Sequence, residues 1–380
     1  MTFSPDDTRH MRRALELARL GLGLVEPNPQ VGCVLVSAAG RVIGQGHHGR
    51  FGGPHAEAAA LQDAHLAGAD IGGSTAYVTL EPCCAHPGKK TTPCANALIA
   101  AGVKRVVAAC GDPFAGVDGG GFAQLRAAGI RVETGLLEDD ARELNQAFFK
   151  RCATGLPWVA LKWAQTLDGR TASLSGDSQW ISNEASRRRV HELRGVCDAV
   201  IVGIGTALAD NPLLTARGVE VRRGARRVVV DPALKLPDSA AMLEDGGPKV
   251  TVACGEAAAQ SARAAALRAR GVEVLGLPVL PGGSALDLRP LLHHLAQTHA
   301  ASRVLVEGGA GLHGHLLRQG MADQLLVFIG PKLLGDGRPA LAGLTVEKMA
   351  QALPLSLHGM ERLGDDVLLD YRMVKLAGNH

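Results

Sequence analysis

Short apolar runs rich in β-branched residues alternate along the chain with longer helix-like runs. In the first half, residues 31–38, 74–80 and 104–110 have the strand pattern, whereas residues 55–68 and 94–102 have the helix pattern. This alternation is typical of an α/β architecture, in which helices cover a mostly parallel sheet. The pattern therefore argues against folds built only of helices or only of strands.

The alternation pauses at a polar helix-like stretch, residues 138–156, which ends near Gly155 and Pro157. We therefore expect two α/β domains, residues 1–150 and 151–380, because a chain of 380 residues is long enough for two separate cores. The second half repeats the alternation. Its expected strands are residues 158–164, 198–204, 226–231, 249–254, 272–277, 303–309, 324–330 and 367–373, and its expected helices are 184–195, 260–271 and 288–299.

The composition limits the classes of partner. Hydrophobic residues make up 46% and charged residues 20% of the chain, which is typical of a globular protein. Aromatic residues are only 3% and the net charge is only +3, which argues against a nucleic-acid surface. A mild positive charge still suits a site for one or two phosphates. We therefore expect a small-molecule partner and no nucleic acid.

The N-terminal stretch, residues 1–21, predicts an amphipathic helix with Met11 and Leu15 on one side. Asp6 and Arg12 interrupt its apolar positions, so it does not have the pattern of a secretory signal. No apolar run reaches the length of about 18 residues that a membrane span needs. These features favour the cytoplasm, where clustered cysteines are more often metal ligands or catalysts than disulfides.

Residues 81–94, EPCCAHPGKKTTPC, hold three of the eight cysteines. Upstream, His55 opens a helix-like run that also contains Glu57, and Cys94 opens the next one. A catalytic zinc site needs three protein ligands and one open position, and His55, Cys83 and Cys94 would supply the three. Helix N-termini favour thiolates. Glu57 would move a proton from the attacking water to a leaving amine, as in zinc nucleobase deaminases.

Other interpretations of these residues stay open. Cys83 and Cys94 could be buried small hydrophobes or half of a structural zinc site, with Cys84 as a fourth ligand. A regulatory protein with a structural zinc would not need Glu57, so that residue favours catalysis. A deaminase for cytidine or for tRNA adenosine is a further alternative. The absence of a basic stripe argues against tRNA, and the second domain argues against both substrates.

Four stretches of the first half carry a family resemblance: PNPQVGCVLV, GQGHHGRFGGPHAEAAAL, VTLEPCCAHPGKKTTPCANALIAAGVKRVV and GDPFAGVDGGGFAQLRAAGIRVETGLL. Together they resemble the deaminase half of the bifunctional riboflavin-biosynthesis deaminase–reductases, over about residues 9–150. The family's cysteine loop has Ser at the position of Cys84 and is two residues shorter. The resemblance implies a cytidine-deaminase-like three-layer domain. It also implies contacts of Asn28 with the base, and of His86 and Lys90 with the base or phosphate.

The second half lacks a GxGxxG motif after its first strand, so a standard Rossmann fingerprint is missing. Two other stretches, GIGTALADNP (203–212) and EGGAGLHGHLL (307–317), place glycines directly after a strand-like run. A glycine-rich turn that leads into a helix can hold a pyrophosphate with its backbone N–H groups. Tight turns use glycine in any case, so the pattern alone leaves both interpretations open.

The segments LKWAQTLDGRTA, SGDSQWIS, HELRG, GIGTALADNPLLTAR and LVEGGAGLHGHLL resemble the reductase half of the same family, over about residues 157–370. The resemblance implies a dihydrofolate-reductase-like fold and hydride transfer from NADPH. Pro232 stands where the family often has Ser, and Asp168-Gly169 is also typical of a plain turn. Implied cofactor contacts are Ala164, Trp180, Thr206, Asp210, Gly309, Ala310, Gly311, Leu312, His313, Gly314 and His315. Implied substrate contacts are Lys162, Ser178, Arg194, Leu214, Arg217 and Glu307.

The sequence thus predicts a two-site enzyme with Zn²⁺ and NADPH as cofactors. In the first domain, zinc-bound hydroxide is expected to replace the 2-amino group of 2,5-diamino-6-ribosylamino-4(3H)-pyrimidinone 5′-phosphate. In the second, NADPH is expected to reduce the ribosyl group, giving 5-amino-6-(5-phosphoribitylamino)uracil. Arg194 and Arg217 suit the phosphate, because a guanidinium offers paired donors. The family also suggests a homodimer or a larger homo-oligomer.

Overall fold

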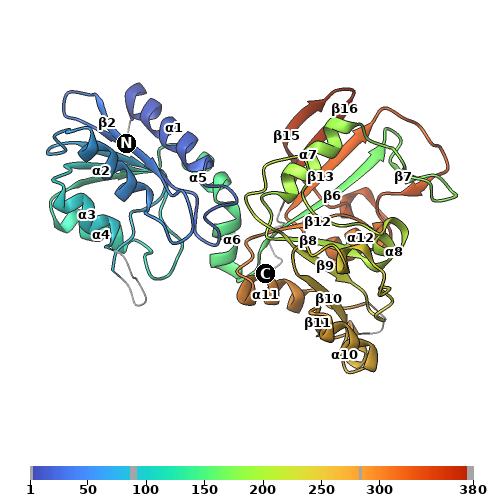
Figure 1. The fold of residues 1–380 in the computed structure, drawn as a ribbon. Helices are drawn as coiled ribbons and strands as arrows, with labels where there is room; N and C mark the ends of the chain where they lie inside the picture. Colours follow the sequence, from blue (N-terminus) through green and yellow to red (C-terminus); the bar gives the residue numbers. More distant parts are fainter. Residues whose placement is uncertain (1–2, 86–91, 282–284, 375–380) are drawn as a thin grey trace. The chain divides into compact units, whose positions relative to one another are not determined.

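The computed structural model describes residues 3–85, 92–281 and 285–374 (Figure 1). Its contacts divide the chain into two compact units, Met1–Gly155 and Leu156–His380. This division falls inside the stretch 138–156 where the sequence pattern pauses. The elements of the first unit are α1 (Pro5–Arg19), β1 (Gly32–Val36), β2 (Val42–His47), α2 (Ala56–Leu66), β3 (Thr75–Val78), α3 (Cys94–Ala100), β4 (Arg105–Ala108), α4 (Gly120–Ala127), β5 (Arg131–Thr134), α5 (Glu138–Leu144) and α6 (Gln146–Thr154).

The first unit is built on a five-stranded sheet in the order β2-β1-β3-β4-β5. Successive residues of β1 belong to two different cores. Cys33 and Leu35 pack with α2, α3 and α4, whereas Val34 and Val36 pack with α1 and α5. Because side chains of a strand alternate between the two faces of its sheet, helices cover both faces. The expected α/β fold with three layers is therefore confirmed.

The pairing of β1 differs from the mostly parallel sheet that the sequence predicts. β1 is antiparallel to both β2 and β3, and parallel pairing begins at β3–β4 and continues to β5. β1 and β2 are joined by a short turn closed by Ser37 N–H and Arg41 C=O at 2.8 Å. Such a short connection can join only antiparallel neighbours.

β2 is a strand that the sequence pattern does not predict, because two of its residues are glycines. A Cβ on Gly44 would lie 2.4 Å from the carbonyl oxygen of Ala60, and one on Gly46 would lie 2.5 Å from the nitrogen of Ala60. The backbone of α2 therefore rests directly on the backbone of β2. This contact brings the N-terminal end of α2, where His55 and Glu57 lie, against the sheet.

The polar stretch before the division forms two helices instead of one. The backbone leaves the helical region at Asn145, between α5 and α6. The Asn145 side chain accepts a hydrogen bond from Gln30 N–H at 2.8 Å and donates one to Gln30 C=O at 2.9 Å. This pair of bonds imitates strand pairing, so tertiary contacts override the helical pattern here.

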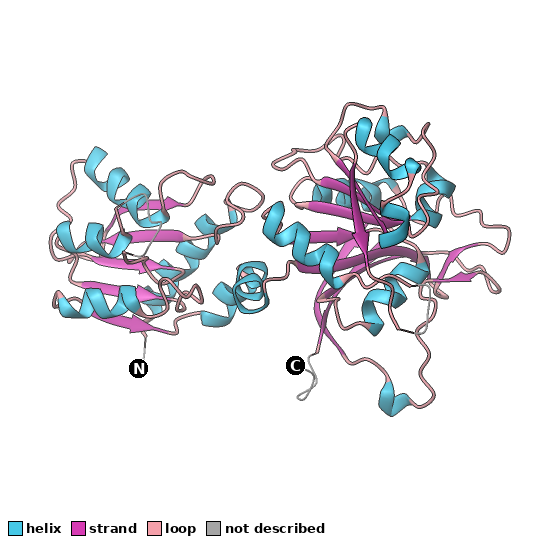
Figure 2. Cartoon of the chain, turned by 90° about the horizontal axis from the view of Figure 1, so that it is seen from below, coloured by secondary structure: helices cyan, strands magenta, loops and turns pink. Residues whose placement is uncertain are grey.

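The second unit is built on a nine-stranded sheet in the order β11-β10-β9-β8-β12-β6-β13-β16-β15, with helices on both faces (Figure 2). Neighbouring strands from β11 to β13 in this order pair in parallel. The last two pairs, β13–β16 and β16–β15, are antiparallel. Its elements are β6 (Trp158–Thr166), β7 (Arg170–Ala172), α7 (Glu184–Arg194), β8 (Ala199–Gly203), α8 (Ile204–Asp210), β9 (Arg226–Val230), η1 (Ala241–Leu243), β10 (Val250–Gly255), α9 (Glu256–Ala259), α10 (Ala262–Ala269), β11 (Glu273–Leu277), α11 (Arg289–Thr298), β12 (Arg303–Val306), α12 (Ala310–Arg318), β13 (Gln324–Gly330), β14 (Arg338–Pro339), η2 (Met349–Gln351), β15 (Leu355–Leu363) and β16 (Asp366–Met373).

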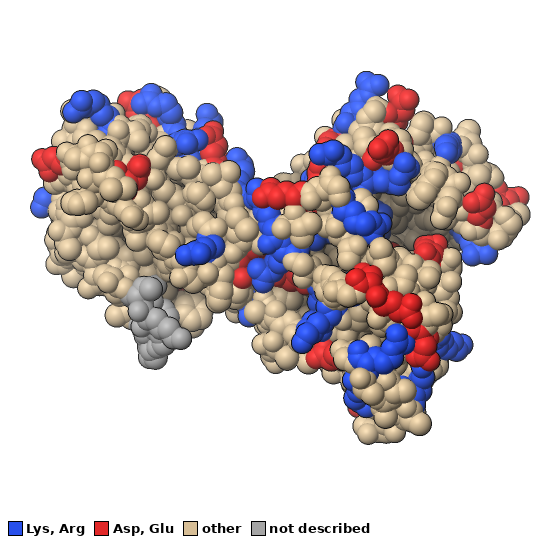
Figure 3. Space-filling view, viewed as in Figure 1, with Lys and Arg blue, Asp and Glu red and all other residues tan. Residues whose placement is uncertain are grey.

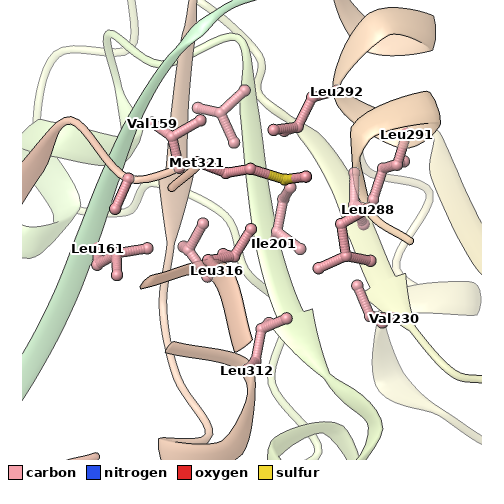
Figure 4. Packing of buried hydrophobic residues seen from close by; sticks show 14 of the residues in the cluster. Val159, Leu161, Ile201, Val230, Leu288, Leu291, Leu292, Leu312, Leu316 and Met321 are labelled. Carbon is pink, nitrogen blue, oxygen red and sulfur yellow. The ribbon is translucent and has the colours of Figure 1, made fainter. Parts of the chain in front are cut away.

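The central strands of this sheet are buried on both faces. On one face, Leu312 and Leu316 of α12 pack beside Ile201 of β8 (Figure 4). On the other face, Val200 and Val202 of the same strand belong to a second core. Strands buried in this way consist of continuous apolar residues. All eight strands expected in the second half are present, whereas the short pair β7 and β14 and the exposed edge strand β15 are not predicted.

Candidate functional site

Three side chains expected to bind zinc converge in the first unit. His55 is the N-cap of α2, Cys83 lies in the loop that follows β3, and Cys94 is the first residue of α3. The Nδ1 atom of His55 lies 3.6 Å from Sγ of Cys83 and 3.4 Å from Sγ of Cys94. The three ligand atoms all lie within 4.8 Å of one another.

These separations fit a tetrahedral zinc ion. Zinc bonds of about 2.3 Å to sulfur and about 2.0–2.1 Å to nitrogen place neighbouring S and N ligands about 3.6 Å apart. The backbone N–H of Cys94 donates to Sγ of Cys83 at 3.4 Å, which favours a thiolate there. The side-chain hydrogen bond with Cys83, together with burial, raises the pKa of the Cys94 thiol. Two ionised thiolates at this spacing therefore need a cation between them.

Glu57 lies in the first turn of α2 and is almost completely buried. Burial raises the pKa of its carboxyl group, and the nearby charge of Cys83 raises it further. A buried carboxyl group beside a metal site can serve catalysis by taking up a proton and releasing it again. Interactions of this carboxyl group with Cys83, His55 and Cys94 place it beside the three residues expected to bind zinc.

Cys84 lies outside this group. Its Sγ contacts the carbonyl oxygen of Gly116 at 3.6 Å, and a Cβ on Gly120 would lie 2.8 Å from the same sulfur. Cys84 thus packs against the segment that precedes α4. Among the described residues, the ligand group in this unit consists of His55, Cys83 and Cys94.

Asn28, expected to contact the base, is linked to the zinc site through a histidine. The Nδ2 atom of Asn28 lies 3.2 Å from Nε2 of His48, and Nδ1 of His48 lies 2.8 Å from the carbonyl oxygen of Pro54. The His48 ring lies 5.3 Å from the His55 ring between centroids. The other two residues expected to contact this substrate, His86 and Lys90, lie outside the described residues.

Two buried acids near the zinc ligands were missed by sequence reasoning. The Glu81 carboxylate accepts backbone N–H groups of Asp112, Gly119 and Phe122 at 3.3, 3.1 and 3.0 Å. Burial raises the pKa of Asp112 to about 6, and the negative charge of Glu81 adds to the effect. Both acids closely follow apolar strand-like runs, which is a signal that could have drawn attention to them.

In the second unit, the two glycine-rich turns line one cavity of about 320 Å³. They follow β8 and β12, which are parallel neighbours in the sheet, so both turns lie at the C-terminal ends of the strands. Five of the expected cofactor contacts line this cavity: Thr206, Gly309, Gly311, Leu312 and His315. Pro232, at the position where the family often has Ser, lines it too.

The turn before α12 fits a phosphate group of a dinucleotide. Gly308 and Gly309 have φ angles of 121° and 86°, which favour glycine, and a Cβ on Gly308 would lie 3.3 Å from Oγ1 of Thr206. A Cβ on Gly311 would meet nothing within 4 Å. Because first-turn N–H groups have no partner within their helix, this open turn can hold an anion.

The remaining expected residues of this helix face the protein. Nε2 of His313 accepts the Gly308 N–H at 3.1 Å, and the His313 ring lies 5.5 Å from the Trp163 ring. Ala310 C=O accepts from Ala342 N–H at 3.1 Å, and a Cβ on Gly314 would lie 2.0 Å from the Ala342 oxygen. Helical periodicity thus divides the run 309–315 between the cavity and the interior.

A second cavity of about 640 Å³ is lined by both Trp180 and Arg217. Arg187 lies over the Trp180 ring at 4.5 Å, and His191 lines the same cavity. Clustered guanidinium groups suit a phosphate. The structure therefore places Trp180, expected to contact the cofactor, beside Arg217, expected to contact the substrate, and adds residues of α7 that sequence reasoning missed.

Glu307 is the centre of a buried charge cluster at the end of β12. Arg194 contacts it with two nitrogens, Nε to Oε1 at 2.5 Å and Nη2 to Oε2 at 2.8 Å. Lys162 Nζ lies 3.6 Å from Oε2. Burial alone would raise the pKa of Glu307, but the positive charge of Arg194 lowers it to about 2. All three residues are expected substrate contacts, and the structure brings them together.

The other expected residues lie in varied surroundings. Leu214 is buried with a left-handed backbone (φ 57°), next to Thr215, whose carbonyl oxygen accepts from Arg194 at 3.2 Å. Asp168 accepts the N–H groups of Leu334 and Gly335, which supports a structural turn. Ala164 is half-buried in β6, Ser178 is half-buried before Trp180, and Asp210 is the exposed last residue of α8.

The surface in Figure 3 carries Lys and Arg side chains interspersed with Asp and Glu side chains, in keeping with the small net charge of +3. Among the helices of the described residues, none is both long enough and apolar enough to span a membrane.

Family models match both units. The model for the cytidine and deoxycytidylate deaminase zinc-binding region matches residues 4–110, and the model for the RibD C-terminal domain matches residues 157–369. These matches cover the residues expected to bind zinc in the first unit and both cavities of the second. They agree with a cytidine-deaminase-like first domain and a dihydrofolate-reductase-like second domain, as the sequence predicts.

Curated relatives match nearly the whole chain. The riboflavin biosynthesis protein RibD of Escherichia coli (strain K12) is 40% identical over 376 residues, covering 96% of this chain and 98% of the relative. The protein of the same name from Aquifex aeolicus (strain VF5) is 38% identical over 367 residues, covering 96% and 98%.

Solved structures give the same result. The structure of Acinetobacter baumannii RibD is 38% identical with a TM-score of 0.85, covering 97% of this chain and 99% of that one. A deaminase/reductase from Thermotoga maritima is 35% identical with a TM-score of 0.83 and the same coverage. With both domains and their order matched, the chain belongs to the RibD family of bifunctional riboflavin-biosynthesis proteins.

Proposed function

We propose that this protein catalyses two successive steps of riboflavin biosynthesis, the deamination of a pyrimidine and the reduction of its ribosyl group. The Thermotoga maritima relative is described as a diaminohydroxyphosphoribosylaminopyrimidine deaminase and 5-amino-6-(5-phosphoribosylamino)uracil reductase. The observation that carries the proposal is the convergence of His55, Cys83 and Cys94 beside buried Glu57, on a chain that also carries the reductase domain. Zn²⁺ and NADPH are the cofactors of these two domains.

In the first domain, His55, Cys83 and Cys94 would hold the zinc ion, and Asn28 would orient the pyrimidine. Zinc, when bound, would supply the lowered pKa that lets a water molecule act as the nucleophile at neutral pH. Glu57 would take up a proton from the attacking water and deliver it to the departing 2-amino group. The C–N bond breaks, ammonia leaves, and the ring gains a carbonyl oxygen at that position. His86 and Lys90 remain proposed contacts of the base or phosphate.

In the second domain, the cavity between the glycine-rich turns would hold the cofactor, and Thr206, Gly309 and Gly311 would contact its phosphates. NADPH supplies the hydride that reduces the ribosyl carbon and opens the sugar to a ribityl chain. Arg194 and Arg217 provide guanidinium donors for the substrate phosphate. Glu307 keeps Arg194 in place, because the two form a buried, two-bonded ion pair.

The cellular location and the oligomeric state both stay predictions. The sequence favours the cytoplasm. The homodimer or larger homo-oligomer that the family suggests also stays a prediction, which sedimentation of the purified protein would test.

The test of the deaminase is ammonia release from the diaminopyrimidine phosphate by purified protein of measured zinc content. Glu57→Gln should reduce this rate at least about 100-fold, because general acid–base groups contribute about 10²–10⁴. Zinc content should be unchanged, since Glu57 is not a ligand. Full activity of the variant would contradict the assigned role, and no ammonia from zinc-loaded wild type would contradict the deaminase itself.

The reductase is tested separately, by NADPH oxidation with the deaminated product as substrate. Glu57→Gln should leave this rate unchanged, because the residue lies in the other unit. Absence of NADPH oxidation with intact protein would refute the second activity while leaving the first untouched.

A further inference from the structure

Glu273, His294 and His299 form a second group of metal-ligand side chains, which lies in the second unit. Glu273 begins the edge strand β11, His294 lies in the last turns of α11, and His299 is the C-cap of that helix. These residues are not among those that line the two cavities. Neither proposed reaction therefore accounts for the cluster.

The ligand atoms of the cluster face one another. Nε2 of His294 lies 2.9 Å from Oε1 of Glu273, and Nε2 of His299 lies 3.1 Å from Oε2. The two imidazole rings meet edge to face, 5.0 Å apart between centroids. Metal bonds of about 2.0–2.2 Å place neighbouring ligand atoms about 3.0–3.5 Å apart. The two separations between Glu273 and the histidines are therefore close to those of a metal site, and all three ligand atoms lie within 4.8 Å of one another.

Further contacts fix the direction of these side chains. Oε2 of Glu273 accepts a hydrogen bond from Oγ1 of Thr251, a fully buried residue of β10, at 2.7 Å. Nδ1 of His294 lies 3.2 Å from Oγ1 of Thr298. Ligands of metal sites are commonly oriented by such outer contacts. Glu273 and His294 are thus each held by a hydrogen bond to a neighbouring threonine.

Some surrounding charges favour a bound cation and others oppose it. The cluster lies at the C-terminal end of α11, where the helix dipole favours a cation. Nη1 of Arg226, however, lies 3.3 Å from Oε2 of Glu273 and repels a second positive charge. The side chains are 20–31% exposed, so an ion can enter from solvent. Binding should therefore be weaker and more readily reversible than at the two thiolates of the first unit.

We propose that Glu273, His294 and His299 bind a divalent transition-metal ion that ties the edge strand β11 to the end of α11. Two imidazoles and one carboxylate form a donor set suited to Zn²⁺ and neighbouring metals, with water at the remaining positions. The ion has a structural role, because the cluster lies away from both cavities. Without an ion, the same residues form a hydrogen-bonded group.

The test is the number of zinc ions per chain after metal removal and reloading with Zn²⁺. Wild type should bind two ions, and the double variant His294→Asn/His299→Asn should bind one. His358→Asn, which changes an exposed histidine of β15, serves as the matched control and should still bind two. One ion in wild type, or two in the double variant, would overturn the proposal.

A second measurement detects zinc binding through its effect on unfolding. In Cys83→Ser/Cys94→Ser, which lacks the first site, the unfolding midpoint should rise with added Zn²⁺, because a ligand that binds the folded state stabilises it. Adding His294→Asn/His299→Asn should abolish the rise. If the cysteine variant does not fold, Co²⁺ titration of wild type replaces it. Thiolate–cobalt absorption should saturate at one equivalent while a second ion still binds, and saturation of total binding at one equivalent would refute the second site.

Discussion

Arg194 in the last turn of α7 and Glu307 at the end of β12 form a buried ion pair with two parallel hydrogen bonds of 2.5 and 2.8 Å. The residues are 113 positions apart in the sequence. Lys162 of β6 approaches the same carboxylate at 3.6 Å. One helix (α7) and two strands (β6 and β12) of the reductase unit therefore meet at one buried negative charge.

Glu307→Gln should impair the reductase selectively. It leaves two buried cations without their partner, and breaking a buried pair costs about 3–5 kcal/mol. We expect a lower unfolding temperature of the second unit and at least about a tenfold loss of kcat/KM for NADPH oxidation. Ammonia release should be unchanged. Glu361→Gln removes a surface partner of Arg189 and is the matched control, expected to cost about 0–1 kcal/mol. Equal effects of the two changes would contradict the prediction.

The same pair should make the second unit sensitive to acid. The pKa of Glu307 is lowered from 4.5 to about 2, so folding is stabilised when the carboxylate is ionised. The contribution is complete above about pH 4.5 and is lost as the pH falls towards about 2. Urea unfolding between these values should show a smaller pH dependence for Glu307→Gln than for wild type. Identical slopes would show that the ion pair does not contribute.

Cys84→Ser should leave the metal site intact. Cys84 packs against the cluster of Cys83, Cys94 and Val117 but is not one of the three residues whose ligand atoms converge, so zinc content and ammonia release should match wild type. Cys83→Ser removes a ligand and should lose both. Metal analysis and activity of the two purified variants provide the comparison. Zinc loss in Cys84→Ser would mean that this cysteine takes part in coordination.

Glu81→Gln should weaken the support of the zinc loop. The carboxylate accepts three backbone N–H groups, and hydrogen bonds to a charged group contribute about 1.5–3 kcal/mol each. A glutamine keeps one oxygen and loses the charge. We expect a lower unfolding temperature of the first unit and faster zinc loss to a chelator, with the reductase unaffected. An unchanged rate of zinc loss to the chelator would show that Glu81 does not support the zinc loop.

Two glycines of α12 should respond differently to alanine. A Cβ on Gly314 would lie 2.0 Å from the Ala342 oxygen, so Gly314→Ala should lower the unfolding temperature. A Cβ on Gly311 would meet nothing within 4 Å but would enter the glycine-lined cavity. Gly311→Ala should keep or slightly raise stability, by up to about 1 kcal/mol, while raising KM for NADPH. An unchanged KM would argue against cofactor phosphates at this turn.

The sequence alone determined the α/β class and the buried parallel strands, and it predicted a zinc-ligand set. Strands such as β8 are apolar throughout because both faces are buried, and the order and chemistry of His55, Glu57, Cys83 and Cys94 predict the zinc site. Local pattern failed where contacts distant in sequence decide the structure. β2 is rich in glycine because α2 rests on it, and Asn145 breaks a helix because it pairs with Gln30.

Only the tertiary structure decided which residues meet. It separated Cys84 from the ligand group, and it placed Trp180 beside Arg217 instead of in the cavity between the glycine-rich turns. It also brought Glu273 from a strand to two histidines of a helix. Periodicity reports which face of an element is buried, whereas distances between side chains of different elements depend on how those elements pack. Site geometry is therefore a property of the packed sheet and helices, which no single segment contains.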